Sequence, residues 1–277
     1  MGIITIRSLW IDELSYLEIS NGSPDPAPLV FFVHGVASDK RQGIPLGYEM
    51  AKKDFIFVSL DTILRGDRKK QEFDLAVGGD FGSIYPDGTW LDGFITMLRM
   101  IKQTALDINA LIDHYKEDPR VDGEKIGFVG YSMGGWAAFY LSAINTQIKA
   151  TAAIAGMPDF EQSWRDLILE CSINPEWAEA MEQVENETDR RTAYIREMNP
   201  ITYLVEASRN PLLMICGDLD QRPKKSCLDL YGAIDKKPHK KTDCVKMSIH
   251  NGIDHQLTLP MVEETAAWFD GIFNKRK

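Results

Sequence analysis

The residues with the clearest chemical potential lie in IGFVGYSMGG, residues 126–135, where Ser132 is the centre of a G-x-S-x-G pattern. A chain of this length contains such a pattern by chance roughly one time in ten, so the pattern alone is weak. Its surroundings are more specific, because IGFV is typical of a buried strand and WAAFYLSA of a helix. A tight strand-to-helix turn strains the serine backbone, excludes side chains two residues away and presents the hydroxyl at a helix N-terminus. The motif therefore predicts a nucleophilic serine.

A serine hydroxyl needs a base that removes its proton and an acid that orients the base. In this strand–turn–helix setting the chain order is serine, then aspartate or glutamate, then histidine. The apolar run PLLMIC is followed by GDLD, which offers Asp218 and Asp220. The run CVKMSI is followed by HNGIDH, which offers His250 and His255. Order and position both fit a Ser–His–Asp site, but the residues alone do not choose within either pair.

These residues must be positioned by the short apolar or alternating runs that recur between helical patterns. The runs predict strands at residues 2–8, 13–19, 29–34, 55–60, 126–131, 150–155, 211–216 and 244–249. The first two are close enough to pair antiparallel, whereas the later runs are continuously apolar, as in parallel strands buried on both faces. The clearest helix runs from Asp92 to Tyr115, where apolar residues recur at three- and four-residue steps. This alternation predicts a doubly wound α/β sheet with right-handed crossovers.

One connection is longer than a simple crossover needs, since more than fifty residues separate ATAAIAG from PLLMICG. The segment 157–208 contains Trp164, Trp177 and the acidic stretch EWAEAMEQVENETDRR, and its pattern is helical. We interpret it as a helical cap over the carboxyl ends of the strands, where open α/β sheets bind ligands. A decorated crossover packed on the sheet edge is the alternative. Without internal repeats or linkers, residues 1–277 are expected to form a single domain with this insertion.

Composition narrows the classes of partner. The 277 residues are 44% hydrophobic and 26% charged, with a net charge of −10. A net negative chain disfavours nucleic acid and anionic membranes, since both require a positive face. The basic clusters DRKK (67–70) and KKPHKK (236–241) are interpreted as solvated loops. No apolar run is long enough to span a membrane, and the N-terminus lacks a signal-peptide pattern, so a cytoplasmic location is expected.

The cysteines and histidines give no metal pattern. The four cysteines lack C-x-x-C spacing and the density of a disulfide scaffold, and Cys216 and Cys244 are expected to be buried because they lie in apolar runs. H-E-x-x-H and the glycine-rich nucleotide-binding motifs do not occur. Neither a metal nor a cofactor is therefore expected.

Several segments together resemble the α/β-hydrolase superfamily, above all small bacterial serine esterases and the catalytic domain of prolyl-oligopeptidase-like peptidases. The segments that carry the resemblance are FFVHGVASDK (31–40), VDGEKIGFVGYSMGG (121–135), NPITYL (199–204), NPLLMICGDLDQRP (210–223) and GIDHQL (252–257). They sample nearly the whole chain in the family's order. The resemblance implies the α/β-hydrolase fold, with an eight-stranded, mostly parallel sheet flanked by helices and a helical cap insertion.

The resemblance also implies a choice within the two pairs. The family's acid is the last residue of G-x-x-D, which is Asp220, and its base is the last residue of G-x-x-H, which is His255. Asp218 is then expected to bond nearby backbone amides, and His250 to be a half-buried neighbour at the strand end.

The segment His34-Gly35-Val36 resembles the family's H-G-x turn beside the nucleophile. This likeness assigns the oxyanion hole to the backbone N–H groups of Val36 and Met133, and a structural role to His34. The segment LDTILRGDRKK resembles the family's D-x-R-G-x-G, but Asp67 and Arg68 replace small residues there. The neighbouring pocket wall is therefore not predicted.

The function implied is a serine hydrolase that cleaves small-molecule carboxylic esters through an acyl-enzyme. A peptidase or amidase of the prolyl-oligopeptidase-like type is the first alternative, although 277 residues do not accommodate the propeller domain of such peptidases. A non-catalytic binding protein with this fold is the second alternative, although such scaffolds normally lose a triad member. A homodimer is one of the oligomeric states that the sequence allows.

Overall fold

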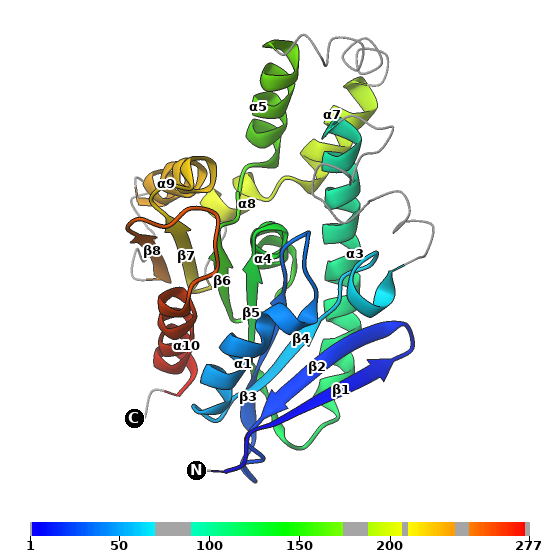
Figure 1. The fold of residues 1–277 in the computed structure, drawn as a ribbon, viewed down its shortest axis with the longest axis vertical. Helices are drawn as coiled ribbons and strands as arrows, with labels where there is room; N and C mark the ends of the chain where they lie inside the picture. The colour runs from blue at the N-terminus through cyan, green and yellow to red at the C-terminus, as the bar shows by residue number, and fades with distance from the viewer. Residues whose placement is uncertain (1, 70–89, 174–187, 207–209, 236–243, 275–277) are drawn as a thin grey trace.

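A computed structural model describes residues 2–69, 90–173, 188–206, 210–235 and 244–274 (Figure 1). The predicted strands are all present in one eight-stranded sheet of order β1-β2-β4-β3-β5-β6-β7-β8. The strands are β1 (Thr5–Ile11), β2 (Leu14–Ser20), β3 (Ala27–Val33), β4 (Ile56–Leu60), β5 (Val121–Tyr131), β6 (Ala150–Ile154), β7 (Leu212–Gly217) and β8 (Val245–His250). β2 pairs antiparallel with β1 and β4, and every other neighbouring pair is parallel. The eight-stranded, mostly parallel sheet is therefore confirmed.

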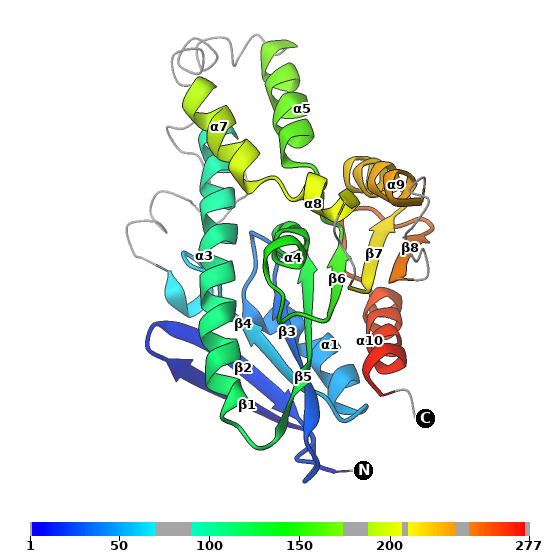
Figure 2. The same cartoon turned by 180° about the vertical axis from the view of Figure 1, so that it is seen from behind.

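Helices cover both faces of this sheet. The helices of the described residues are α1 (Ile44–Ala51), α3 (Trp90–Lys116), α4 (Met133–Ile144), α5 (Phe160–Ile173), α7 (Thr188–Met198), α8 (Ile201–Glu206), α9 (Gln221–Asp235) and α10 (Leu259–Phe273), with short 3₁₀ turns η1 (Lys40–Gly43) and η2 (Gly66–Arg68). α1 and α10 lie on one face, and α3 and α4 lie on the other (Figures 1 and 2). The helix predicted from Asp92 to Tyr115 is α3 and extends slightly beyond both limits.

The alternation of side chains along β3 builds a core on each face. Leu29, Phe31 and Val33 are fully buried against the layer of α3 and α4. Val30 and Phe32 are fully buried against the layer of α1 and α10. A strand with helices on both faces is apolar at every position, which explains its continuous apolar run.

Two strands, β1 and β5, differ from the sequence prediction by three or more residues at a limit. β1 is displaced toward the C-terminus because it pairs with β2 from Thr5 to Ile11 across a tight turn. β5 begins five residues early, at Val121, because that residue pairs with Ala27. The polar residues 122–125 thus lie within a strand that the apolar pattern does not include.

The helices of the predicted cap region stand beyond the carboxyl ends of the parallel strands (Figure 2). α5 and α7 lie against each other and against α3. The Trp164 ring of α5 lies 5.4 Å from the Phe94 ring of α3, and Lys102 of α3 pairs with Glu197 of α7 at 3.0 Å. Residues 174–187, including Trp177, lie outside the described residues.

The interpretation of DRKK as a solvated loop is wrong for one of its residues. The Arg68 side chain is only 8% exposed, and its Nη1 lies 2.6 Å from Oδ2 of Asp107 on α3. The turn η2 folds the chain back and brings the guanidinium to the helix. The second cluster, KKPHKK at 236–241, lies outside the described residues.

The prediction that Cys216 and Cys244 are buried is right for the first residue only. Cys216 is fully buried in β7, but Cys244 is only partly buried because it precedes the edge strand β8. Cys227 of α9 is fully buried instead. Among the described residues, no helix combines the length and apolar composition that a membrane crossing requires.

Candidate active site

Ser132 occupies a strained turn between β5 and α4. Its backbone has φ 54° and ψ −115°, outside the regions that L-residues favour, at a cost of about 1–3 kcal/mol. The glycines of the motif make the turn feasible. A Cβ on Gly130 would lie 1.7 Å from the carbonyl oxygen of Gly134, and a Cβ on Gly134 would lie 2.0 Å from that of Val33. Close backbone packing, rather than flexibility, therefore requires glycine at both positions.

The loops that follow β7 and β8 bring an acid and a histidine to this serine. His255 Nε2 lies 2.7 Å from Ser132 Oγ, and His255 Nδ1 lies 2.7 Å from Asp220 Oδ2. The His255 side chain is 45% exposed, whereas that of Asp220 is only 10% exposed. The structure thus places the three predicted residues in one continuous hydrogen-bonded chain that ends at the hydroxyl.

The other member of each pair lies outside this chain. Asp218 Oδ1 accepts hydrogen bonds from the backbone N–H groups of Gly252 at 2.6 Å and Ile253 at 3.2 Å. His250 ends β8 and contacts Glu264 of α10 through Nε2, at 2.9 Å. Asp218 therefore fastens the loop that carries the imidazole, as expected, while His250 lies in a separate surface cluster.

His34 is fully buried beneath the turn beside the nucleophile. Its Nε2 accepts the backbone N–H of Thr62 at 3.2 Å, and its Nδ1 lies 2.7 Å from the Gly35 carbonyl oxygen. These partners require a neutral ring with the proton on Nδ1. Burial lowers the pKa of His34, which keeps the ring in this neutral form. His34 thus has the structural role that the sequence suggested.

Val36 and Met133 line the same cavity as Ser132. Met133 is the first residue of α4, where the helix leaves N–H groups without intrahelical partners. The Val36 turn is held by Gln42, whose Oε1 accepts the Gly35 N–H at 2.9 Å, and by Arg65, whose Nε donates to the Val36 carbonyl. The arrangement is suited to bind an oxyanion above the serine.

Three supporting residues have no individual role in the sequence prediction. Gln42 and Arg65 hold the Val36 turn, and Tyr131 holds the histidine loop. The Tyr131 hydroxyl donates to the His255 carbonyl oxygen at 2.9 Å, and the two rings lie 5.6 Å apart. Burial raises the pKa of Tyr131 to about 12, so this donor keeps its proton. Two of these residues could have been found from the sequence: Arg65 through its place in the segment LDTILRGDRKK, and Tyr131 through its place beside Ser132.

Asp67 and Arg68, the unusual residues of the LDTILRGDRKK segment, form ion pairs outside the cavity at Ser132. Lys40 Nζ lies 2.7 Å from Asp61 Oδ2 and also contacts Asp67, whose Oδ2 accepts the Ser15 hydroxyl at 3.0 Å. None of the described residues of this segment lines the cavity at Ser132.

The cavity at Ser132 has a volume of about 380 Å³. Its apolar part is formed by the side chains Phe94, Met97, Trp136, Met157 and Leu167. Phe94 and Met97 come from α3, and Leu167 comes from α5, within the predicted cap. The described residues contain no group of three or more His, Cys, Asp or Glu side chains that could hold a metal ion.

The amino-acid sequence matches a known protein family. The sequence profile of the prolyl oligopeptidase family matches residues 94–276. The Bacillus subtilis (strain 168) protein named "Putative esterase YitV" is 23% identical over 272 residues, which are 97% of this chain and 99% of that protein.

Two solved structures show the fold. The acetyl xylan esterase from Paenibacillus sp. R4 matches with a TM-score of 0.66 at 12% identity, over 97% of this chain and 88% of that chain. The Pyrococcus horikoshii acylaminoacyl peptidase matches with a TM-score of 0.64 at 18% identity. The match covers 99% of this chain but only 42% of the peptidase.

Proposed function

Since the chain belongs to the prolyl oligopeptidase family of hydrolases, we propose that it cleaves carboxylic esters by acyl transfer to Ser132. The observation that carries this proposal is the hydrogen-bonded chain from Asp220 through His255 to Ser132, which opens into an apolar cavity. The base 2.7 Å from the hydroxyl can take its proton as the oxygen attacks a carbonyl carbon. The cavity offers space for the acyl group at that position.

In the proposed reaction, Ser132 Oγ attacks the ester carbonyl while His255 Nε2 accepts its proton. Asp220 keeps the other ring proton on Nδ1 and stabilises the imidazolium that forms. The N–H groups of Val36 and Met133 stabilise the negative oxygen, and one such donor contributes roughly 3 kcal/mol in the transition state. His255 then gives its proton to the departing alcohol, which leaves an acyl-enzyme. Water activated by the same histidine releases the acid.

Ester cleavage is favoured over amide cleavage by the relatives that this chain matches over most of their length. YitV, which carries an esterase name, is covered over 99% of its length. The acylaminoacyl peptidase supports the amidase alternative, but this chain spans less than half of it. The apolar cavity lining further suggests short or medium acyl chains.

Rates on p-nitrophenyl esters of increasing chain length, together with a peptide p-nitroanilide, test the ester proposal. We expect kcat/KM to be highest for a short or medium acyl chain, because longer chains exceed the cavity, and to be lowest for the anilide. A higher kcat/KM for the peptide anilide than for every ester would favour the peptidase alternative. Failure to cleave any of these substrates would favour a binding protein.

The two aspartates of the acid loop provide a matched pair of variants. Asp220→Asn is expected to lower kcat on the order of 10⁴-fold, because an amide favours the wrong tautomer of His255. Asp218→Asn is expected to lower kcat less than about tenfold, because the asparagine Oδ1 still accepts the loop N–H groups. Steady-state kinetics on the preferred ester measure both. Similar losses in the two variants would contradict the assignment of the acid.

A further inference from the structure

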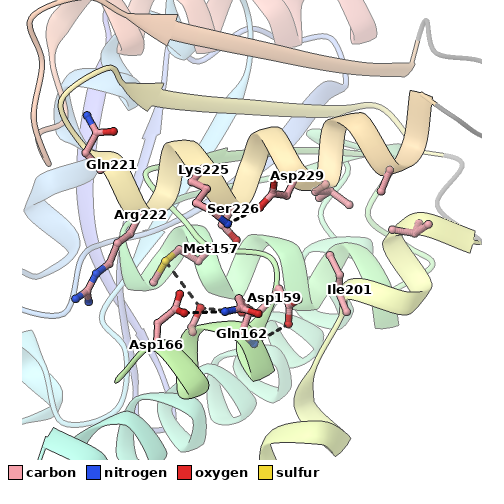
Figure 3. Close-up of a pocket in the computed structure, with 14 residues that line it drawn as sticks. Met157, Asp159, Gln162, Asp166, Ile201, Gln221, Arg222, Lys225, Ser226 and Asp229 are labelled. Carbon is pink, nitrogen blue, oxygen red and sulfur yellow. Dashed lines mark hydrogen bonds and ion pairs between the residues drawn. The ribbon is translucent and has the colours of Figure 1, made fainter. Parts of the chain in front are cut away.

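A second cavity of about 350 Å³ adjoins the one that contains Ser132 (Figure 3). It lies between α9 on one side and α5 and α8 on the other. Four residues line both cavities: Met157, Ser163, Gln221 and Arg222. The two cavities therefore adjoin along this shared wall, and a ligand long enough to pass it would reach both.

Two residues of the shared wall adjoin the acid that holds the histidine. Gln221 and Arg222 follow Asp220 directly, and Asp220 holds the His255 ring. His255 must protonate the oxygen of the departing alcohol, so the alcohol lies on the histidine side of the carbonyl. Phe94 and Trp136 provide an apolar lining for the acyl group. The second cavity is thus placed to receive the alcohol portion.

Polar side chains of α5 and α9 line the second cavity and face one another across it (Figure 3). Gln162 Nε2 donates to Asp166 Oδ1 at 2.7 Å on α5, and Lys225 Nζ pairs with Asp229 Oδ2 at 2.9 Å on α9. Each pair includes a donor and a carboxylate with further acceptor capacity. Hydroxyl groups, which donate and accept, can bond to both walls.

A charged alcohol fits this lining less well than a neutral one. The cations Arg222 and Lys225 are already paired, with Glu170 and Asp229 respectively. A charged ligand would have to compete with these ion pairs, whereas a hydroxylated ligand can bond to their outer lone pairs and protons. The lining therefore favours a neutral group that carries several hydroxyls.

We propose that the second cavity is a subsite for a polyhydroxylated alcohol, so that the preferred substrates are esters of sugar-like alcohols with an apolar acyl group. This inference rests on the proposed ester hydrolysis. Under this proposal, Asp166 of α5 and Lys225 of α9 help to determine which alcohol portion the protein accepts.

Calorimetric titration of the Ser132→Ala protein tests the subsite separately from catalysis. The probes are 6-O-butanoylglucose and cyclohexylmethyl butanoate, which share the acyl group and a six-membered ring but differ in hydroxyls. Adding Asp166→Ala is expected to raise the Kd of the glucose ester about tenfold, since a hydroxyl bond to a charged carboxylate is lost. The Kd of the cyclohexylmethyl ester is expected not to rise. Lys225→Met is likewise expected to raise the Kd of the glucose ester and to leave that of the cyclohexylmethyl ester unchanged.

Asp235→Ala is the matched control, because Asp235 is an exposed α9 residue that lines neither cavity. It should leave both Kd values unchanged. Equal effects of Asp166→Ala on the two esters, or no binding of the glucose ester to the Ser132→Ala protein, would overturn the subsite. If the wild-type protein binds the glucose ester without hydrolysing any ester, the subsite stands and the proposed reaction fails.

Discussion

Replacing Ser132 with alanine is expected to lower kcat on the order of 10⁵- to 10⁶-fold, because the hydroxyl that forms the acyl-enzyme is lost. Alanine lacks only the hydroxyl, and both residues experience similar strain at φ 54°. The fold should therefore persist, as circular dichroism and the melting temperature can show. The rate is measured on the p-nitrophenyl ester that the wild-type protein cleaves fastest.

Ser172→Ala is a suitable control for this change, because Ser172 is an exposed residue of α5 whose hydroxyl bonds to the Leu169 carbonyl. It should alter kcat less than twofold, by analogy with other surface substitutions. If the Ser132→Ala protein retained more than about 1% of the wild-type rate, Ser132 could not be the nucleophile that dominates the reaction.

The second large effect concerns the two histidines of the segment 248–258. His255→Ala is expected to lower kcat by a factor similar to that of Ser132→Ala, because the serine loses the base 2.7 Å from its hydroxyl. His250→Ala is expected to lower kcat less than about tenfold, because His250 contacts Glu264 rather than the site. Kinetics of the two variants on the same ester compare these roles directly.

His250→Ala should instead change stability slightly. Burial raises the pKa of Glu264, but bonds from Lys246, His250 and Ser248 outweigh this effect, and the net pKa is lowered. Loss of one of these three partners of Glu264 is expected to lower the free energy of unfolding by about 1 kcal/mol or less, which a small fall in melting temperature would show. Equal losses of kcat in the two histidine variants would contradict the choice of His255.

The elements that position the site were predictable because their patterns are local. A strand with helices on both faces is largely apolar, so β3, β4, β6 and β7 stand out in the sequence, whereas the edge strand β8 alternates. The beginnings of β1 and β5 were not predictable, because they depend on partners elsewhere in the sheet. Val121 is in a strand only because Ala27 lies beside it.

The candidate site shows the same division. The motif around Ser132 is local, because its glycines are required by close backbone contacts within one turn and with β3. The choice between Asp218 and Asp220 is not local, because both lie in one short loop and differ in what the folded chain brings to them. Family resemblance supplied that choice. The second cavity joins α5 to α9, which no single stretch of sequence displays.

Labelling of the native protein with a fluorophosphonate, followed by peptide mass spectrometry, tests the central claim most directly. The probe reacts with a serine only when a base and an oxyanion site activate it. We predict one adduct, on Ser132, which is absent after denaturation and absent in the Ser132→Ala protein. No adduct on Ser132, or an adduct on another residue that the Ser132→Ala protein retains, would contradict the assignment of Ser132 as the nucleophile.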